Sequence, residues 1–364
     1  MDDMKVLIVD DSAFMRKMIT DFLSGYEGIE VVGTAKNGKE ALIQIEKHRP
    51  DAVTMDVEMP VMDGISALKE IMDKFSIPVI MLSSTTQTGA ESTIKALEAG
   101  AVDFVAKPSG SISLDLHKIR DELREKILNA KNVKNIMPLV PEKEKESSHN
   151  LHKYSKISTV REKYPRLDII IRQKQPIICI GTSTGGPRAL QRVLPFLPAA
   201  IKAPIFIVQH MPKGFTASLA DRLDKLSQIR VMEARHGSKA EAGTAYIAPG
   251  GFHLTVVQQG SELYMSVKDT PVRNGHRPSV DVLFESISLL SNCSNVAVIM
   301  TGMGTDGTKG LSRMKEQGNT VSIAEGEQSS VVFGMPKSAI AANVIDSVDH
   351  VDHIAEKIMQ YIQS

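Results

Sequence analysis

The sequence has only two cysteines, no net charge and no long apolar run, and each absence narrows what the protein can be. Cys179 and Cys293 lie far apart, each inside an apolar segment, which is typical of buried, reduced thiols rather than of a disulfide or a metal site. The 43 Lys and Arg residues balance the 43 Asp and Glu residues, so no overall field attracts nucleic acid or an anionic membrane. No apolar run approaches the length needed to span a bilayer, and the acidic start, MDDMKVLIVDD, lacks the features of a signal peptide. We therefore expect a cytoplasmic protein without membrane insertion.

Several motifs of other protein classes are also missing. The chain has no cluster of His and Cys that could bind zinc and no basic recognition helix of the kind that reads DNA, so we expect no nucleic-acid partner. Neither G-x-G-x-x-G nor the lysine of a nucleotide-binding P-loop is present. The Gly-rich turns at 181–186 and 302–310 could still cradle a phosphate. A non-catalytic nucleotide-binding module therefore remains the alternative to an enzyme.

Hydrophobic periodicity divides the chain into two α/β regions. Within residues 1–126, five short apolar runs alternate with stretches of helical period, which predicts a doubly wound, five-stranded parallel sheet. Residues 127–174 are rich in Lys, Glu and Ser, so we expect a charged flexible linker there. A second alternating series fills residues 175–364 and predicts a doubly wound, mostly parallel α/β domain. Between Tyr246 and Lys268 short strand-like runs follow one another without a helix, which predicts an antiparallel hairpin that interrupts the parallel order.

Polar side chains close four strands of the first region. Asp10 and Asp11 follow KVLIV, Asp56 follows DAVTM, Ser83 follows PVIML and Lys107 follows DFVA. The carboxyl ends of parallel strands share one edge of the sheet, so these side chains should meet. Three carboxylates at one point repel one another unless a hard cation such as Mg²⁺ lies among them. We therefore predict a magnesium site in which Asp56 accepts a phosphoryl group, while Lys107 and the Ser83 hydroxyl contact its oxygens.

An acidic residue at a strand end can instead cap the following helix, and Asp11 or Ser12 could be no more than an N-cap. Taken together, however, VDDS, MDVEMPVMDG, LSS and AKP resemble the receiver domain of two-component response regulators, and the resemblance covers this region from end to end. The resemblance implies a flavodoxin-like fold and phosphorylation of Asp56 by a histidine kinase. It also implies that Mg²⁺ is bound by Asp10, Asp11, Asp56 and the backbone carbonyl of Glu58, and that Ser83 and Lys107 read the phosphoryl group.

A candidate nucleophile lies at the start of the second region. The segment PIICI-GTSTGG-PRALQRVL predicts a strand, a Gly-rich turn and a helix whose first turn contains Pro187. Residues 181–185 fit G-x-S-x-G, in which a sharp strand-to-helix turn presents the central serine, here Ser183. Free N–H groups at the start of the helix could stabilise an oxyanion. The alternative is the phosphate-binding turn of a dinucleotide fold.

A serine nucleophile needs a general base, and the base needs an acid that orients it. His210 closes the run APIFIVQ, and Asp306 lies in TGMGTDGTKG just beyond NVAVIM, so both should reach the same sheet edge as Ser183. Each has an alternative, because His210 could be a buried structural histidine and Asp306 could cap the helix that follows it. The competing bases are His236, His253 and His276, together with His350 and His353, which fall on the polar face of a predicted terminal helix where a solvated role is favoured.

Five motifs that follow the receiver resemble the CheB family of chemotaxis protein-glutamate methylesterases: IGTSTGGP, VQHMP, YIAPG, GHRPSVDVLFES and MTGMGTDGTKG. The resemblance implies hydrolysis of glutamate methyl esters, and deamidation of glutamines, on methyl-accepting chemotaxis receptors, with a chemotaxis histidine kinase as phosphodonor. It assigns Ser183 as nucleophile, His210 as base and Asp306 as orienting acid, with the backbone of Met303 as an oxyanion donor. We expect no cofactor for the esterase step, and we expect the unphosphorylated receiver to rest over the active site.

Overall fold

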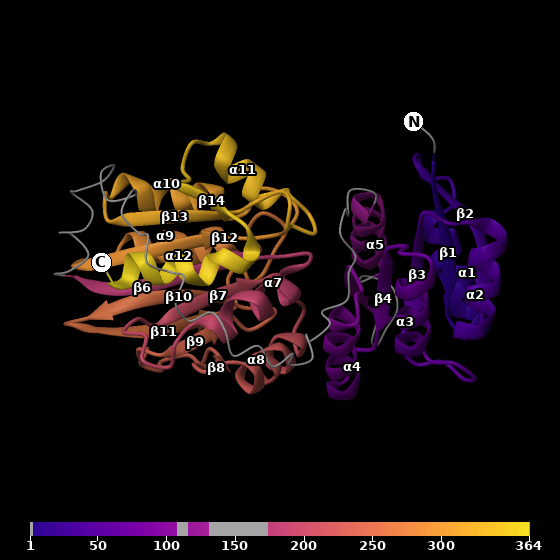
Figure 1. The fold of residues 1–364 in the computed structure, drawn as a ribbon, viewed down its shortest axis with the longest axis horizontal. Helices are drawn as coiled ribbons and strands as arrows, with labels where there is room; N and C mark the ends of the chain where they lie inside the picture. Colours follow the sequence, from indigo (N-terminus) through magenta and orange to yellow (C-terminus); the bar gives the residue numbers. More distant parts are fainter. Residues whose placement is uncertain (1–2, 108–115, 131–173, 364) are drawn as a thin grey trace, which may run out of the picture.

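The computed structural model of the protein describes residues 3–107, 116–130 and 174–363, which form two α/β units (Figure 1). The first unit is a five-stranded sheet with the strand order β2-β1-β3-β4-β5, parallel in every pair, as the periodicity and the receiver resemblance predict. This is the order of the flavodoxin-like fold. Its strands are β1 (Met4–Val9), β2 (Ile29–Ala35), β3 (Ala52–Asp56), β4 (Val79–Ser83) and β5 (Asp103–Ala106).

The helices of this unit cover both faces of its sheet. Strand residues of one parity pack against α2, α3 and α4, and those of the other parity pack against α1 and α5, because side chains alternate between faces along a strand. The sheet is thus doubly wound, as predicted. The helices are α1 (Ala13–Leu23), α2 (Gly38–His48), α3 (Gly64–Lys74), α4 (Gln87–Glu98) and α5 (Leu116–Ala130).

Short polar side chains start four of these helices. Ser12, Asn37, Asp63 and Thr86 each accept a hydrogen bond from the backbone N–H three residues later, which satisfies one of the unpaired donors of a helix N-terminus. Ser12 is therefore the N-cap of α1, and Asp11 is exposed and free of that role. The carboxylate of Asp11, in the loop after β1, is thus not used to cap helix α1.

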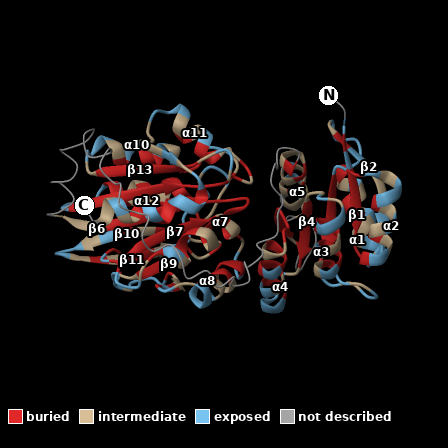
Figure 2. Cartoon of the chain, in the orientation of Figure 1, coloured by how far each residue is buried: buried red, intermediate tan, exposed pale blue. Residues whose placement is uncertain are grey.

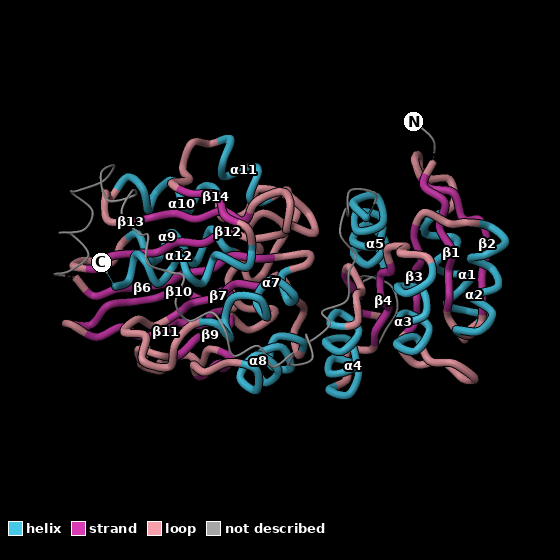
Figure 3. Tube along the Cα trace, in the orientation of Figure 1, coloured by secondary structure: helices cyan, strands magenta, loops and turns pink. Residues whose placement is uncertain are grey.

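The second unit contains a seven-stranded sheet with the order β14-β13-β12-β6-β7-β9-β8 (Figures 1 and 3). Each described pair of neighbouring strands in it is parallel. From β6 the chain first adds β7, β8 and β9 on one side, with β8 at the edge and β9 between β7 and β8, and then adds β12, β13 and β14 on the other side. The strand order therefore reverses beside β6, where α/β proteins form their ligand sites. The strands are β6 (Gln175–Thr182), β7 (Ile205–Gln209), β8 (Arg230–Glu233), β9 (Thr244–Ile247), β12 (Cys293–Ile299), β13 (Thr320–Glu325) and β14 (Ser347–Asp349).

Helices also cover both faces of this second sheet. Apolar residues of α7 (Gly186–Val193), α8 (Phe215–Leu226) and α12 (Val351–Gln363) pack against one face, and those of α9 (Val280–Ser288), α10 (Thr308–Glu316) and α11 (Met335–Ala341) pack against the other. A short 3₁₀ helix, Leu194–Phe196, follows α7. The predicted doubly wound architecture is confirmed. None of the described helices is both long and apolar enough to cross a membrane.

The predicted antiparallel hairpin is present, but it does not interrupt the large sheet. β10 (His253–Gln259) and β11 (Glu262–Lys268) pair with each other as a separate two-stranded sheet. Their inward-facing residues pack on the helical face that holds α9 and α10. The interpretation that the hairpin breaks the parallel order was therefore wrong, because the hairpin is an additional layer.

The two units contact each other through helices α4, α7 and α8, and buried residues line both sheets up to this junction (Figure 2). The rings of Phe104, from β5, and Phe215, from α8, lie with their centroids 4.6 Å apart. The segment between the units was predicted to be a linker from residue 127. Helix α5 continues to Ala130, so residues 127–130 are helical, and residues 131–173 lie outside the described part of the chain.

Candidate functional sites

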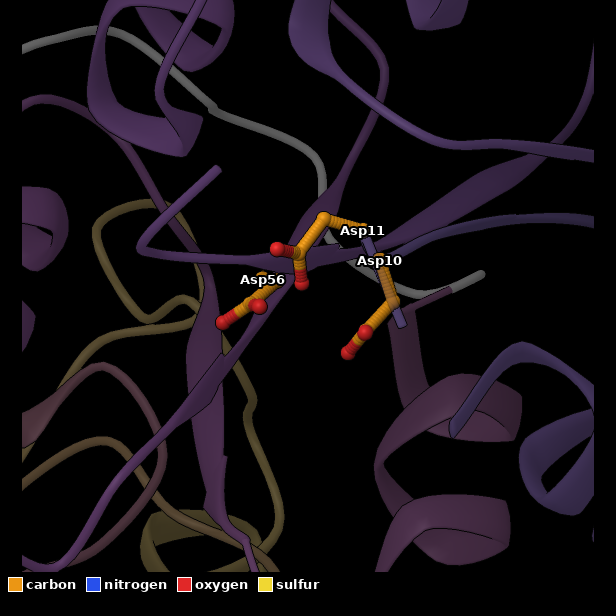
Figure 4. Close-up of side chains that lie close together, drawn as sticks. All are labelled: Asp10, Asp11 and Asp56. Carbon is orange, nitrogen blue, oxygen red and sulfur yellow. The ribbon is translucent and has the colours of Figure 1, made fainter. Parts of the chain in front are cut away.

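The acidic residues predicted to bind a cation do come together. Asp10 and Asp11 follow β1, Asp56 ends the neighbouring strand β3, and one carboxylate oxygen of each lies within 4.8 Å of the others (Figure 4). Asp10 and Asp56 are buried, whereas Asp11 is exposed. Three hard oxygen donors with one side open to solvent suit Mg²⁺, which keeps several of its waters. The residues present therefore fit the predicted metal.

Lys107 supplies positive charge to the same cluster. Its Nζ lies 2.9 Å from Asp10 Oδ2 and 2.6 Å from Asp56 Oδ2. Burial alone would lower the pKa of Lys107, but its hydrogen bonds to the two carboxylates raise that pKa above its usual value. Burial raises the pKa of Asp56, and Lys107 only partly opposes this. One lysine thus leaves the cluster short of positive charge, which a divalent cation would supply.

Ser83 and Glu58, the two other residues predicted for this site, make contacts that the sequence did not indicate. The Ser83 hydroxyl, at the end of β4, is buried and lies 3.0 Å from the carbonyl oxygen of Gly89 in α4, to which it donates. It can reach a phosphoryl group on Asp56 only if it gives up this bond. The backbone N–H of Glu58 bonds to the Asp56 carboxylate and lowers its pKa. That a carbonyl of Glu58 binds the metal stays a prediction.

Ser183 lies in the predicted strand-turn-helix, between β6 and α7. Gly185 has a positive φ of 78°, and a Cβ there would come within 2.5 Å of Val331, so the turn requires glycine at this position. The Ser183 N–H donates to the carbonyl of Thr301, which follows β12, at 3.0 Å. The turn that carries Ser183 is thus tied to the end of the neighbouring strand β12.

Gln209 is a positioning residue that the sequence patterns did not reveal. This buried side chain ends β7, accepts from the Thr182 hydroxyl at 2.7 Å, and donates to the carbonyls of Ser183 at 2.9 Å and His210 at 3.1 Å. A Cβ on Gly186 would meet Gln209 Oε1 at 1.9 Å, so glycine makes room for this amide. Gln209 therefore joins the turn after β6 to the turn after β7.

His210 and Asp306 form the predicted pair, with 2.9 Å between Nε2 and Oδ2. The other ring nitrogen, Nδ1, is buried and has no hydrogen-bond partner within the described residues, so the Ser183 hydroxyl is not bonded to it here. Nδ1 is the atom that remains available to take a proton. The His276 ring stacks on His210 with centroids 3.8 Å apart and planes 11° apart. Burial, and then the proximity of His210, lower the pKa of His276 to about 4, so this neighbour is neutral at pH 7.

Asp306 is held by four donors besides His210. The carboxylate accepts from the N–H groups of Val280 at 2.6 Å and Asp281 at 3.2 Å, which start helix α9, and from the Ser279 hydroxyl at 2.8 Å. The Asn274 amide donates to it at 2.9 Å. Burial favours a raised pKa, but the His210 partner and these donors hold the pKa of Asp306 well below its usual range. Asp306 is therefore a carboxylate at neutral pH.

The alternatives left open for these residues can now be judged. Helix α10 begins after Gly307 without a side-chain cap, so Asp306 does not cap that helix. Among the competing histidines in the described chain, His253 is buried between backbone groups and accepts from the Ser279 N–H at 3.2 Å. The ring of His236 accepts from the backbone N–H of Val267 at 3.2 Å. His350 and His353 are exposed on or beside α12, as expected for solvated residues.

The Gly-rich turns do not form an open phosphate cradle. The N–H groups of Ser183 and Gly186 donate to carbonyls of the protein, and those of Gly307 and Gly310 donate to the buried Asp281 carboxylate. A phosphate that used these four N–H groups would have to displace their bonds. The arrangement therefore disfavours a nucleotide-binding module.

The loop after β12 passes close to Ser183. A Cβ on Gly302 would lie 2.7 Å from Ser183 Cβ, and the Gly302 N–H is taken by the Val332 carbonyl at 3.0 Å. The next N–H along the loop, that of Met303, donates to no backbone carbonyl within the described residues, and the same is true of Thr184. Both N–H groups lie beside the serine. The family resemblance indicated that of Met303, and the predicted helix start indicated free N–H groups such as that of Thr184.

The first unit covers this site. Asp103, at the start of β5, accepts from the Thr184 hydroxyl at 2.5 Å, directly beside Ser183. Glu98 of α4 pairs with Arg222 of α8 at 2.5 Å. With these contacts in place, Ser183 is only 9% exposed and Thr184 only 8%. An ester carried by another protein therefore cannot reach Ser183 in this arrangement.

The fold and the two sites define a response regulator whose receiver domain is joined to an α/β output domain with the side chains of a serine hydrolase. Two family models match the chain: the response regulator receiver domain over residues 6–117 and the CheB methylesterase over residues 178–358. The chain belongs to the CheB methylesterase family.

Similar proteins span the whole chain. A protein-glutamate methylesterase/protein-glutamine glutaminase of Geobacillus kaustophilus is 53% identical over 100% of this chain and 99% of its own length. A protein of the same name from Bacillus subtilis is 49% identical over 99% of this chain and 98% of its own. The solved catalytic domain of the Thermotoga maritima CheB methylesterase is 44% identical, with a TM-score of 0.49, and the match covers 52% of this chain and 98% of that domain.

Proposed function

We propose that this protein hydrolyses methyl esters of glutamate, and amides of glutamine, on methyl-accepting chemotaxis receptors under control of its receiver domain. The names of its full-length relatives support this substrate class. The observation that carries the chemistry is the buried His210–Asp306 pair at the sheet edge where Ser183 follows β6. Release of methanol from methylated chemoreceptor membranes tests the activity, and membranes that retain all their methyl esters would exclude it.

In the proposed reaction Ser183 is the nucleophile and His210 the base. Nδ1 of His210 takes the hydroxyl proton of Ser183, and the oxygen attacks the side-chain carbonyl carbon of the substrate. The tetrahedral intermediate collapses, the C–O bond to the methoxy group breaks, and His210 returns the proton to the departing methanol. Water then repeats the sequence on the acyl-serine and releases glutamate. With a glutamine substrate, ammonia leaves in place of methanol.

Two groups support this reaction electrostatically. Asp306 remains ionised and stabilises the imidazolium that forms on His210, as its low pKa requires. The backbone N–H groups of Met303 and Thr184 are the donors we assign to the oxyanion, because both are unpaired beside Ser183. The turn after β6 and the Gly-rich loop after β12 would thus supply the two donors of an oxyanion hole.

We assign the receiver cluster to phosphorylation of Asp56 by a histidine kinase. Asp10, Asp11 and Asp56 would hold Mg²⁺, with the carbonyl of Glu58, and the ion when bound neutralises charge on the transferred phosphoryl group. Lys107 already contacts Asp56 and would pair with a phosphoryl oxygen there. Ser83 would donate to another oxygen after releasing Gly89.

Phosphorylation would act on the interface through β5. Lys107, directly after this four-residue strand, bonds Asp56, while Asp103 at its other end bonds Thr184. A new partner for Lys107 therefore shifts the strand that holds the receiver on the active site. We assign residues 1–130 to the receiver, because helix α5 ends at Ala130, residues 175–364 to the catalytic domain and the segment between them to the linker. We also infer a cytoplasmic location, consistent with two free, buried cysteines.

The Asp56→Asn variant is expected to lose phosphorylation entirely. The amide lacks the nucleophilic carboxylate, so incubation with Mg²⁺ and acetyl phosphate should add no phosphoryl mass to the chain. Mass spectrometry of the intact protein measures this directly. Asp73→Asn, at an exposed position in α3, is the matched control and should be phosphorylated like the wild type. Phosphoryl incorporation by Asp56→Asn would move the acceptor elsewhere.

Charge reversal at the interface is expected to release the catalytic domain without phosphorylation. Glu98→Arg places two guanidinium groups against each other where an ion pair now stands, so methanol release by the unphosphorylated chain should rise roughly 5-fold or more. The double variant Glu98→Arg/Arg222→Glu restores an ion pair of opposite orientation and should return to the low rate. A single variant as slow as the wild type, or a double variant as fast as the single, would contradict the gating role.

A further inference from the structure

The segment Arg273–His276 forms a tight turn at the rim of the proposed active site. Arg273 and His276 exchange two backbone hydrogen bonds, at 3.1 and 2.9 Å, across Asn274 and Gly275. Both central residues have positive φ, 53° for Asn274 and 81° for Gly275, a backbone that Asn and Gly adopt most readily. The turn delivers the His276 ring onto His210 and the Asn274 amide onto Asp306.

The Asn274 amide bridges two buried carboxylates. Nδ2 donates to Asp281 Oδ2 at 2.8 Å and to Asp306 Oδ1 at 2.9 Å. Asp281 and Asp306 are 0% and 2% exposed, whereas Asn274 itself is exposed. The amide therefore lies on the solvent side of the two acids and places its two N–H groups between them, where their like charges would otherwise face each other.

Asp281 in turn fixes the loop that carries Asp306. Its Oδ1 accepts from the N–H groups of Gly307 at 2.9 Å and Gly310 at 2.7 Å. Asn274, Asp281 and the 306–310 loop are thus one closed ring of hydrogen bonds that uses Oδ1 of Asp306. The other oxygen, Oδ2, accepts from the Val280 N–H and is the one that meets His210 Nε2.

We propose that Asn274 is a positioning residue for the catalytic pair, an inference that rests on the proposed serine-esterase function. Its double donation holds Asp306 so that Oδ2 points at His210, and it compensates the charge of two adjacent carboxylates. The other titratable groups beside the pair are Asp281, His276, which stacks on His210, and His253, on which the charge of Asp306 acts. The charges of Arg273 and Arg277 act on His253, and that of Lys126 acts on His276.

Two variants separate the charge of this side chain from its geometry. Asn274→Asp has the same shape and tolerates positive φ, but it turns two donors into acceptors opposite two carboxylates. The negative charge added beside the catalytic pair should move the acid limb of the kcat/KM profile up by about one pH unit. Asn274→Gly keeps the backbone and deletes the amide, and kcat should fall roughly 10-fold with little change in KM. Asn292→Asp, also exposed and at positive φ, is the matched control at the opposite end of β12.

The experiment measures methanol release by the full chain from pH 5 to 9, together with the downfield NMR signal of the His210 Nε2–H proton. A shifted acid limb in Asn274→Asp alone, with a weakened Nε2–H signal in both Asn274 variants, supports the proposal. Profiles and signals that coincide with the wild type overturn it, even if thermal stability falls. Wild-type protein that releases no methanol would instead refute the esterase function, and the NMR signal would still decide whether Asn274 orients the pair.

Discussion

Ser183→Ala is expected to lower methanol release from methylated receptor membranes by at least about 10³-fold, because no acyl-enzyme can form without the hydroxyl. The residual rate would come from the oxyanion donors and the bound substrate alone. Steady-state release of labelled methanol, with the phosphodonor present so that the site is open, measures the effect. The turn itself should survive, since it is held by the Ser183 backbone and not by its side chain.

Ser291→Ala is the control for that experiment. Ser291 is exposed, at a turn before β12, and its hydroxyl bonds only to the Gln258 side chain. Its removal should leave the rate within a factor of about two, as for most surface substitutions. If Ser183→Ala were as active as this control, Ser183 would not be the nucleophile, and the His210–Asp306 pair would have to activate water instead.

Asp306→Asn is expected to lower kcat by about 10³ to 10⁴-fold while the fold is retained. The amide is isosteric, but its NH₂ group must face donors that now point at a carboxylate, namely the N–H groups of Val280 and Asp281 and the Ser279 hydroxyl. It also cannot compensate the imidazolium of His210. Circular dichroism checks that the variant is folded, and the rate of methanol release gives the effect.

Asp221→Asn, exposed on α8, is the matched control for Asp306→Asn and should keep the wild-type rate. A loss of less than about 10-fold in Asp306→Asn would mean that the carboxylate orients the histidine without stabilising its charge. That result would assign Asp306 a structural role at the start of α9, where its backbone contacts already place it.

The site residues that directly follow or end a strand could be grouped from the sequence alone. A parallel sheet places the carboxyl ends of its strands at one edge, so Asp10 and Asp56 in one unit, and Ser183 and His210 in the other, could be grouped from the apolar runs before them. Asp306 required only one further step, because it lies in the loop that follows the strand β12. Each group of residues lies together because its members follow neighbouring parallel strands, whose carboxyl ends meet at one edge of the sheet.

The groups that hold these side chains were not predictable in this way. Asn274 and Ser279 reach Asp306 from a segment about 30 residues earlier in the chain, which no local period connects to β12. Gln209 looks like the last residue of a strand, and only the structure shows its amide between two turns. Strand β14, with three residues, is too short to give a periodic signal.

The contact between the receiver and the catalytic domain was expected from the family resemblance, but its chemistry was not. Asp103 is followed in its strand by apolar residues, and no sequence pattern indicates that its carboxylate accepts a hydrogen bond from Thr184. The structure shows that a carboxylate of the receiver bonds the residue next to the proposed nucleophile. Long-range pairs of this kind depend on how two folded units meet, which hydrophobic periodicity does not encode.

The most direct test of receiver-gated esterase chemistry is the rate of methanol release by the intact wild-type chain before and after addition of Mg²⁺ and a phosphodonor. Burial of Ser183 and Thr184 under the receiver predicts a slow rate that rises at least about 5-fold on phosphorylation. Equal rates in the two states, with phosphorylation of Asp56 verified by mass, would contradict the claim that the receiver controls access to the active site.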